Sequence, residues 1–171
     1  MLHLKRFSES ESGVAAVEFA LWMVFAVPLF LTTIDFVFYN TNRIDVNKAT
    51  GEAAIFAFNS RSSVDSTIGG TLENIITSSS GIDPQNLSVT ITCNGSATCT
   101  DTNRVLACLN TSQLQIEFDS APSGGNALCA DGTAPGYFLK VDVTAVFDPF
   151  FGGSFVEPPE TINTTLTVKL E

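Results

Sequence analysis

The sequence has little histidine and few basic residues. Its single histidine, His3, lies far from the four cysteines, whose spacing lacks the paired C-x2-C of common zinc sites. Lysine and arginine number 8 against 18 acidic residues, which gives a net charge of −10. Nucleic-acid binding requires a basic face. We therefore expect no nucleic-acid partner and no metal site.

Catalytic motifs are also missing. Beyond the N-terminus there is no histidine, no G-x-S-x-G nucleophile elbow and no phosphate-binding glycine loop. Asp142 and Asp148 lie six residues apart without an adjacent acid or metal signature, and we interpret them as solvent-facing side chains. The sequence therefore predicts no enzyme, no cofactor and no small-molecule substrate.

One long apolar run stands near the N-terminus. From Val14 to Ile34, a run of 21 residues, Glu18 is the only ionisable residue. As a helix this run is about 30 Å long, close to the hydrocarbon thickness of a bilayer. We interpret it as a single membrane span, because it is too long for a signal peptide and no A-x-A site follows it. Lys5 and Arg6 precede it, so the positive-inside tendency predicts a cytoplasmic N-terminus and an exported C-terminal part.

The four cysteines predict disulfides. Cys93, Cys99, Cys108 and Cys129 fall within 37 residues of the exported part, and disulfides imply an oxidising compartment. Four cysteines allow three pairings. We favour Cys93 with Cys99 and Cys108 with Cys129, because each pair closes a short loop. The second loop contributes about 3 kcal/mol by chain-entropy reasoning.

Helical periodicity continues past the apolar run. We expect one helix from about Gly13 to about Phe58, with a kink or local unwinding at Pro28 because proline removes an N–H and clashes with the preceding turn. The expected apolar stripe of its second half has spacings of 3, 4 and 3 and consists of Val46, Ala49, Ala53 and Phe56.

A second helix and several strands are expected after it. The helix has Ile68, Leu72, Ile75 and Ile76 on one side and Gly81 as its stop. Apolar and polar residues then alternate in four segments, which predicts half-buried strands at 87–93, 114–118, 137–147 and 161–170. The predicted fold is α+β, with a long N-terminal helix packed on a small antiparallel sheet of about four strands.

The order of residues around Glu18 is specific. The run GVAAVEF places Gly13 five residues before Glu18, and Phe19 and further apolar sequence follow. This resembles the processing site of type IV pilin-like proteins, in which a membrane peptidase cuts after a glycine and leaves glutamate at the fifth mature position. Residues 12–31, SGVAAVEFALWMVFAVPLFL, more closely resemble the N-terminal signature of the TadE/TadG-like minor pseudopilins of the tight-adherence (Flp) pilus.

The resemblance implies a pilin-like fold and a role in assembly. Cleavage after Gly13 makes Val14 the first residue, and its new α-amino group can pair with Glu18 of a neighbouring subunit; we place Phe19 in the same assembly site. Two charges in a low dielectric then compensate one another. Small residues allow close helix packing, and those in this segment are Ala15, Ala16 and Ala20.

The resemblance also implies partners and a location. The expected partners are a prepilin peptidase, other minor pseudopilins, the major Flp pilin and an inner-membrane pilus assembly platform. We expect a cytoplasmic leader at 1–13, a transmembrane helix at 14–35, a periplasmic helical extension at 36–60 and a disulfide-bonded domain at 61–171. The expected location is the bacterial inner membrane, with incorporation into a pilus for adhesion. The alternative is a single-span envelope protein whose exported domain binds a ligand or partner.

Overall fold

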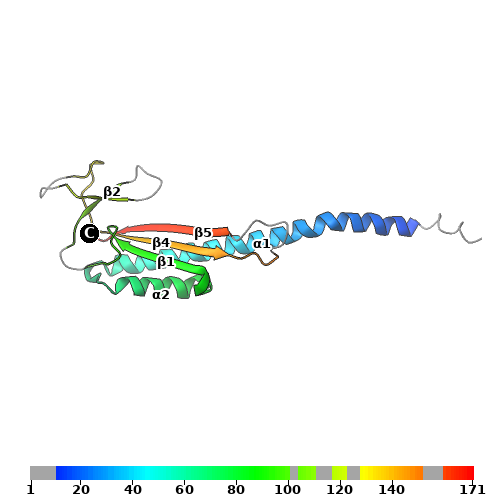
Figure 1. Ribbon diagram of the computed structural model, residues 1–171, viewed down its shortest axis with the longest axis horizontal. Helices are drawn as coiled ribbons and strands as arrows, with labels where there is room; N and C mark the ends of the chain where they lie inside the picture. Colours follow the sequence, from blue (N-terminus) through cyan, green and yellow to red (C-terminus); the bar gives the residue numbers. More distant parts are fainter. Residues whose placement is uncertain (1–10, 101–103, 111–116, 123–127, 152–159) are drawn as a thin grey trace, which may run out of the picture. The chain divides into compact units, whose positions relative to one another are not determined.

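The computed structural model describes residues 11–100, 104–110, 117–122, 128–151 and 160–171. As the sequence predicts, the fold is α+β, with a long N-terminal helix and antiparallel strands (Figure 1). The strands form two sheets, of three and two strands, rather than one sheet of about four. The elements are α1 (Glu11–Asn59), α2 (Ile68–Ser80), β1 (Leu87–Cys93), β2 (Ala107–Asn110), β3 (Glu117–Ser120), β4 (Phe138–Phe147) and β5 (Glu160–Lys169).

The chain divides into two compact units, and α1 contributes to both. The described part of the first unit is residues 11–40 and 148–151. The second unit begins at Thr41 and contains all the strands and α2. Each unit therefore has its own set of internal contacts.

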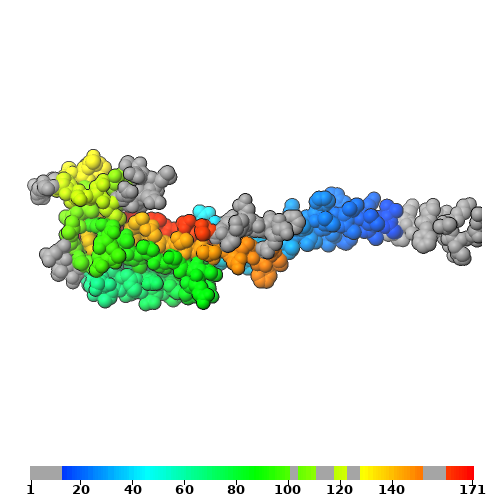
Figure 2. Space-filling model, viewed as in Figure 1, coloured from blue at the N-terminus to red at the C-terminus, as the bar shows by residue number. Residues whose placement is uncertain are grey.

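The first part of α1 is apolar and exposed. Residues 13–27 are all exposed, and Figure 2 shows the side chains of this blue segment bare. The helix is long and apolar enough to cross a membrane, by length and composition. Helical hydrogen bonding satisfies the backbone internally, which is what a lipid environment requires.

Pro28 lies inside α1, and the helix continues through it. The missing N–H of proline deprives the preceding turn of one donor. Just beyond it, the Thr32 hydroxyl donates to the Pro28 carbonyl at 2.9 Å and the Thr33 hydroxyl to the Leu29 carbonyl at 2.8 Å. The two threonine hydroxyls are therefore additional hydrogen-bond donors to the carbonyls of this turn. The kink at Pro28 stays a prediction.

In the second unit α1 packs through small residues. Val46, Ala49 and Ala53 are fully buried, as the stripe predicts. The expected fourth member was wrong: Phe56 is 39% exposed and Ala57 is fully buried instead. Ala57 lies four residues after Ala53, on the same helical face. An alanine lets the helix approach its neighbours more closely than a phenylalanine would.

The main sheet has the strand order β1-β4-β5, with β4 in the middle and both pairs antiparallel. Alternate residues of β4 form its apolar face, and they are buried: Leu139, Val141, Val143 and Ala145. The Thr164 hydroxyl of β5 and the Asn47 amide oxygen of α1 lie 2.7 Å apart, which joins helix to sheet. In Figure 1 the three strands run side by side, with α2 and the cyan part of α1 alongside them.

The second helix follows its prediction closely. Ile68, Leu72 and Ile76 of α2 are buried, and Ile75 is half-buried. Gly81 ends the helix with φ of 65°, in the left-handed region that a side chain disfavours. The helical period and the glycine stop therefore both point to the observed element.

The two-stranded sheet differs from the prediction. A strand was expected at 114–118, but β3 runs from Glu117 to Ser120, and residues 114–116 lie outside the described ranges. β3 pairs with β2, which the sequence did not predict, and does not join the main sheet. A bridge between Ala107 and Gly136 connects β2 to the segment before β4.

Both disulfides are present. Cys93 bonds to Cys99, with Cα atoms 5.2 Å apart, and Cys108 bonds to Cys129, with Cα atoms 5.6 Å apart. This is the pairing that loop length favours. The first bond closes the turn after β1, and the second connects β2 to the loop before β4.

Candidate functional site

Glu18 lies on an exposed apolar face of α1. Residues three, four and seven positions further along share its side of the helix, and these are Leu21, Trp22 and Phe25. Together with Glu18 they line a shallow hollow on the helix surface. Among residues 13–27, the Glu18 carboxylate is therefore the single charge, and it lies on a face of large apolar and aromatic side chains.

The small residues near Glu18 occupy two faces. Ala16 and Ala20 are four residues apart and share a side of the helix that is turned away from Glu18, whereas Ala15 lies one turn before Glu18 on its own side. Gly13 and Val14 are exposed at the start of the described side chains. Phe19 is 65% exposed. The predicted cleavage site and assembly residues are thus accessible on one helix.

Asp35 is a functional candidate that the sequence interpretation missed. It is the first ionisable residue after the apolar run, and it is only 5% exposed. Its Oδ1 accepts hydrogen bonds from the backbone N–H of Phe150 at 3.0 Å and of Phe151 at 3.3 Å, and its Oδ2 lies 3.3 Å from the Phe151 nitrogen. Both partners belong to the same unit as Asp35. The carboxylate therefore fixes the start of the loop that follows β4.

Residues 13–54 match the family of TadE-like proteins. Over these residues the chain is similar to TadE-like proteins. The match begins at Gly13, includes Glu18 and Asp35, and reaches the buried stripe of α1 up to Ala53. No curated protein and no solved structure matches the chain.

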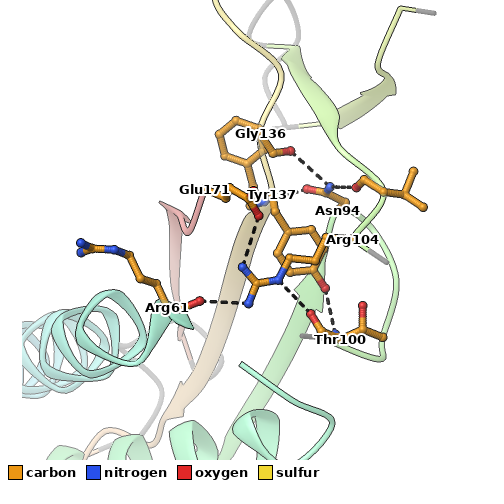
Figure 3. A network of polar contacts seen from close by, with 9 residues as sticks. Arg61, Asn94, Thr100, Arg104, Gly136, Tyr137 and Glu171 are labelled. Atoms are coloured by element: carbon orange, nitrogen blue, oxygen red, sulfur yellow. Dashed lines mark hydrogen bonds and ion pairs between the residues drawn. The ribbon is translucent and has the colours of Figure 1, made fainter. Parts of the chain in front are cut away.

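Beyond the TadE-like segment, Arg104 forms the centre of a polar network (Figure 3). Its guanidinium donates to the carbonyls of Arg61 at 2.9 Å and Thr100 at 3.1 Å, and to the Glu171 carboxylate at 3.4 Å. It also lies over the Tyr137 ring, 5.2 Å from the centroid. The Tyr137 hydroxyl accepts from the Thr100 N–H at 3.0 Å. This network joins the residues after α1, the first disulfide loop and the end of β5.

Asn94 completes the network from a special backbone position. Its φ of 46° places it in the left-handed region that asparagine tolerates better than most residues. Its amide nitrogen donates to the Val105 carbonyl at 2.6 Å, and its amide oxygen accepts from the Phe138 N–H at 2.8 Å. Both ends of the side chain are therefore occupied by the fold.

A pocket of about 340 Å³ adjoins this network. Its lining includes Asn94, Thr100 and Tyr137, together with Phe118 and Asp119 from β3. The Asp119 carboxylate accepts from the Asn110 amide at 3.0 Å. The polar groups that a ligand would use are largely hydrogen-bonded within the chain itself. The lining residues therefore stabilise the fold.

The remaining carboxylates lie in local structures. The Thr67 hydroxyl and backbone N–H donate to Asp65, and the Thr133 backbone N–H and hydroxyl donate to Asp131, which lowers the pKa of both carboxyls below the usual value. Both aspartates are exposed turn residues. Asp142 is half-buried and pairs with Lys140 at 2.9 Å, so its solvent-facing interpretation was only partly right, whereas Asp148 is exposed. Among the described residues no group of His, Cys, Asp and Glu is arranged to hold a metal ion.

Proposed function

We propose that this protein is a minor pseudopilin, a structural and non-enzymatic subunit that takes part in assembly of a Tad/Flp-type pilus. The observation that carries the proposal is the TadE-like match over 13–54 together with Glu18 exposed on an apolar helix face. An unpaired carboxylate in hydrocarbon costs about 2.5 to 3.5 kcal/mol on insertion scales. A partner charge removes that cost, so Glu18 favours the assembled state.

The partner charge is created by processing. A prepilin peptidase cuts between Gly13 and Val14, and the α-amino group of Val14 in one subunit then pairs with Glu18 of the next. Phe19 packs beside this pair, and Ala15, Ala16 and Ala20 allow the helices to approach closely. Removing one member of a buried pair costs about 3 to 5 kcal/mol, because the other charge is left uncompensated. The pair therefore sets the register between neighbouring subunits.

The domain organisation follows from this role. Residues 1–13 form the cytoplasmic leader, 14–35 span the inner membrane, 36–60 continue the helix into the periplasm, and 61–171 form the disulfide-bonded domain. The partners are the other minor pseudopilins, the major Flp pilin and the assembly platform. Two disulfides support an oxidising location for the C-terminal part.

The test compares two glutamates of the same helix in cells with an active prepilin peptidase. Glu18→Gln is expected to be cut and inserted like the wild type but to fall at least about tenfold in the pilus fraction, since tenfold corresponds to only about 1.4 kcal/mol. The matched control is Glu52→Gln, an exposed position of α1 in the other unit, which is expected to assemble normally. The readouts are the N-terminal sequence of the protein and its amount in sheared pili.

Two results would contradict the proposal. An intact Met1 on the wild-type chain in these cells would exclude processing, and Gly13→Leu is the control that should block the cut. Equal assembly of the Glu18 and Glu52 variants would exclude the charge pairing while leaving processing intact.

A second candidate is a single-span envelope protein whose exported domain binds a small ligand in the pocket beside Tyr137. The pocket volume of about 340 Å³ favours it, since ligand sites start near 300 Å³. Against it, Asn94, Tyr137 and Asp119 are all hydrogen-bonded within the fold. The assembly proposal accounts for more of the chain.

A further inference from the structure

Two phenylalanines after β4 form an exposed aromatic pair within the first unit. Phe150 is 79% exposed and Phe151 is 39% exposed, and their rings meet edge to face with centroids 4.9 Å apart. Phenylalanine has no polar group to gain from water. Full burial of an aromatic side chain removes about 150 to 250 Å² from water, and Phe150 still exposes most of its surface. The pair is thus a conspicuous apolar surface outside the helix.

Asp35 fixes the depth of this pair along α1. The backbone nitrogens of Phe150 and Phe151 lie 3.0 and 3.3 Å from Asp35 Oδ1. The apolar run ends at Ile34, directly before Asp35. The interfacial layer of a bilayer is roughly 5 to 7 Å thick on each side of the hydrocarbon core. If 14–34 fills the core, the aromatic pair is held at the level of that layer.

The chemistry of this region suits a lipid interface. Tryptophan and tyrosine are enriched at the headgroup level of membranes, and phenylalanine is among the residues that interfacial helices bury at the boundary between headgroups and acyl chains. Phe36 and Phe38, just beyond Asp35 on α1, are 66% and 51% exposed, so the helix itself also exposes aromatic side chains close to Asp35 in the sequence. The Asp35 charge is compensated by two backbone N–H groups rather than left bare. No basic side chain lies between 14 and 40 or between 148 and 151, so the surface suits zwitterionic lipid rather than an anionic one.

We propose that Phe150 and Phe151 form a second membrane contact, an interfacial anchor that Asp35 holds against the end of the membrane span. The occupant of this surface is the phospholipid headgroup and upper acyl layer. The loop after β4 is thereby tied to the bilayer as well as to α1. The inference rests on the proposed membrane span of 14–35 and adds a contact that a single-span topology does not require.

Depth-dependent fluorescence quenching tests the anchor in the full chain. Trp22 is the only tryptophan, so a Trp22→Phe, Phe150→Trp variant reports on the loop alone. The protein is reconstituted in phosphatidylcholine vesicles carrying bromine near the carbonyl end or near the methyl end of the acyl chains. We expect the tryptophan at 150 to be quenched at least about twofold more by the carbonyl-end label, as an interfacial position requires. The quenching should not change with salt.

The unmodified chain is the depth standard. Trp22 lies near the middle of the apolar run, so it should be quenched best by the methyl-end label. If Trp22 is not quenched best by the methyl-end label, the predicted membrane span is wrong, and the proposed anchor is then wrong too. If Trp22 is deep but the tryptophan at 150 is quenched only by aqueous acrylamide, the span stands and the anchor is overturned. Protection from acrylamide that disappears as the protein is diluted with lipid would identify a second copy as the occupant, and would also overturn it.

The role of Asp35 is tested in the same background. Asp35→Ala removes both acceptor oxygens and is expected to reduce the carbonyl-end quenching by at least about half, whereas Asp35→Asn keeps one acceptor oxygen and should retain most of it. Amide hydrogen exchange of β4 checks that the second unit remains folded in both variants. Carbonyl-end quenching as strong in Asp35→Ala as in the parent variant with Asp35 intact would show that Asp35 does not position the loop.

Discussion

Arg104 connects parts of the chain that no single element could hold together. Its guanidinium has five N–H donors in a planar fork, and it contacts the carbonyls of Arg61 and Thr100, the Glu171 carboxylate and the Tyr137 ring. The side chain of Arg104 is only 12% exposed, whereas that of Glu171 is 62% exposed. Arg104 therefore contributes to stability through its carbonyl and ring contacts more than through its ion pair.

This difference gives a prediction at the residue scale. Arg104→Lys should lower the free energy of unfolding of the second unit by about 1 to 2 kcal/mol, because a lysine ammonium cannot reproduce the fork or the ring contact. Glu171→Gln should cost less than about 0.5 kcal/mol, since exposed ion pairs contribute little. Amide hydrogen exchange of β4 in the full chain measures both. A larger loss for Glu171→Gln would mean that the ion pair carries the network.

The candidate site was predictable where its residues are close in sequence. Gly13, Val14 and Glu18 form a local pattern whose spacing is itself the signal. Asp35 had no such pattern, because its partner Phe150 is 115 residues away. A carboxylate directly after an apolar run was the available hint, since such a charge needs compensation. Only the folded chain shows that the compensation comes from backbone N–H groups.

Helix α1 performs two different tasks along its length. Its first part exposes large apolar side chains, while its second part buries Val46, Ala49, Ala53 and Ala57. Hydropathy identifies the first part, and helical spacing identifies most of the second. Spacing alone did not distinguish Phe56 from Ala57, because the two are adjacent and the favoured face drifts along the helix.

The contrast between Phe56 and Ala57 gives a prediction at the element scale. Ala57→Leu should destabilise the second unit by about 1 to 3 kcal/mol, because the added atoms have no space in a packed core. Phe56→Ala should cost less than about 1 kcal/mol, well below the roughly 3 to 5 kcal/mol expected for a core phenylalanine. Denaturant dependence of β4 hydrogen exchange gives both values. A larger loss of stability for Phe56→Ala than for Ala57→Leu would show that Phe56, and not Ala57, is the core residue.

Strand prediction succeeded in proportion to strand length. β1 has seven residues and β4 and β5 have ten each, long enough for alternation to be visible. β2 and β3 have four residues each, too few for a period of two to emerge from the surrounding polar loop. Cys108 belongs to β2 and bonds to Cys129, so this disulfide closes a loop that contains β3 and helps to hold the two strands together.

At the scale of the whole molecule, the disulfides supply stability that a small core lacks. Replacing Cys108 and Cys129 together by alanine, which opens a loop of sequence separation 21, should cost about 3 kcal/mol. The same replacement at Cys93 and Cys99, with a separation of 6, should cost about 2 kcal/mol. Chemical denaturation of the full chain in detergent micelles compares them. A smaller loss for the longer loop would contradict the chain-entropy explanation.

The position of the disulfides between β1 and β4 also bears on how fast the sheet forms. β1 ends at Cys93 and β4 begins at Phe138, so the two strands can pair only after the whole connection between them closes. Each disulfide formed within that connection shortens the free chain that must be closed, and the entropic barrier falls with its logarithm. We therefore expect a chain whose thiols are kept reduced to form its main sheet more slowly than a chain whose disulfides form first.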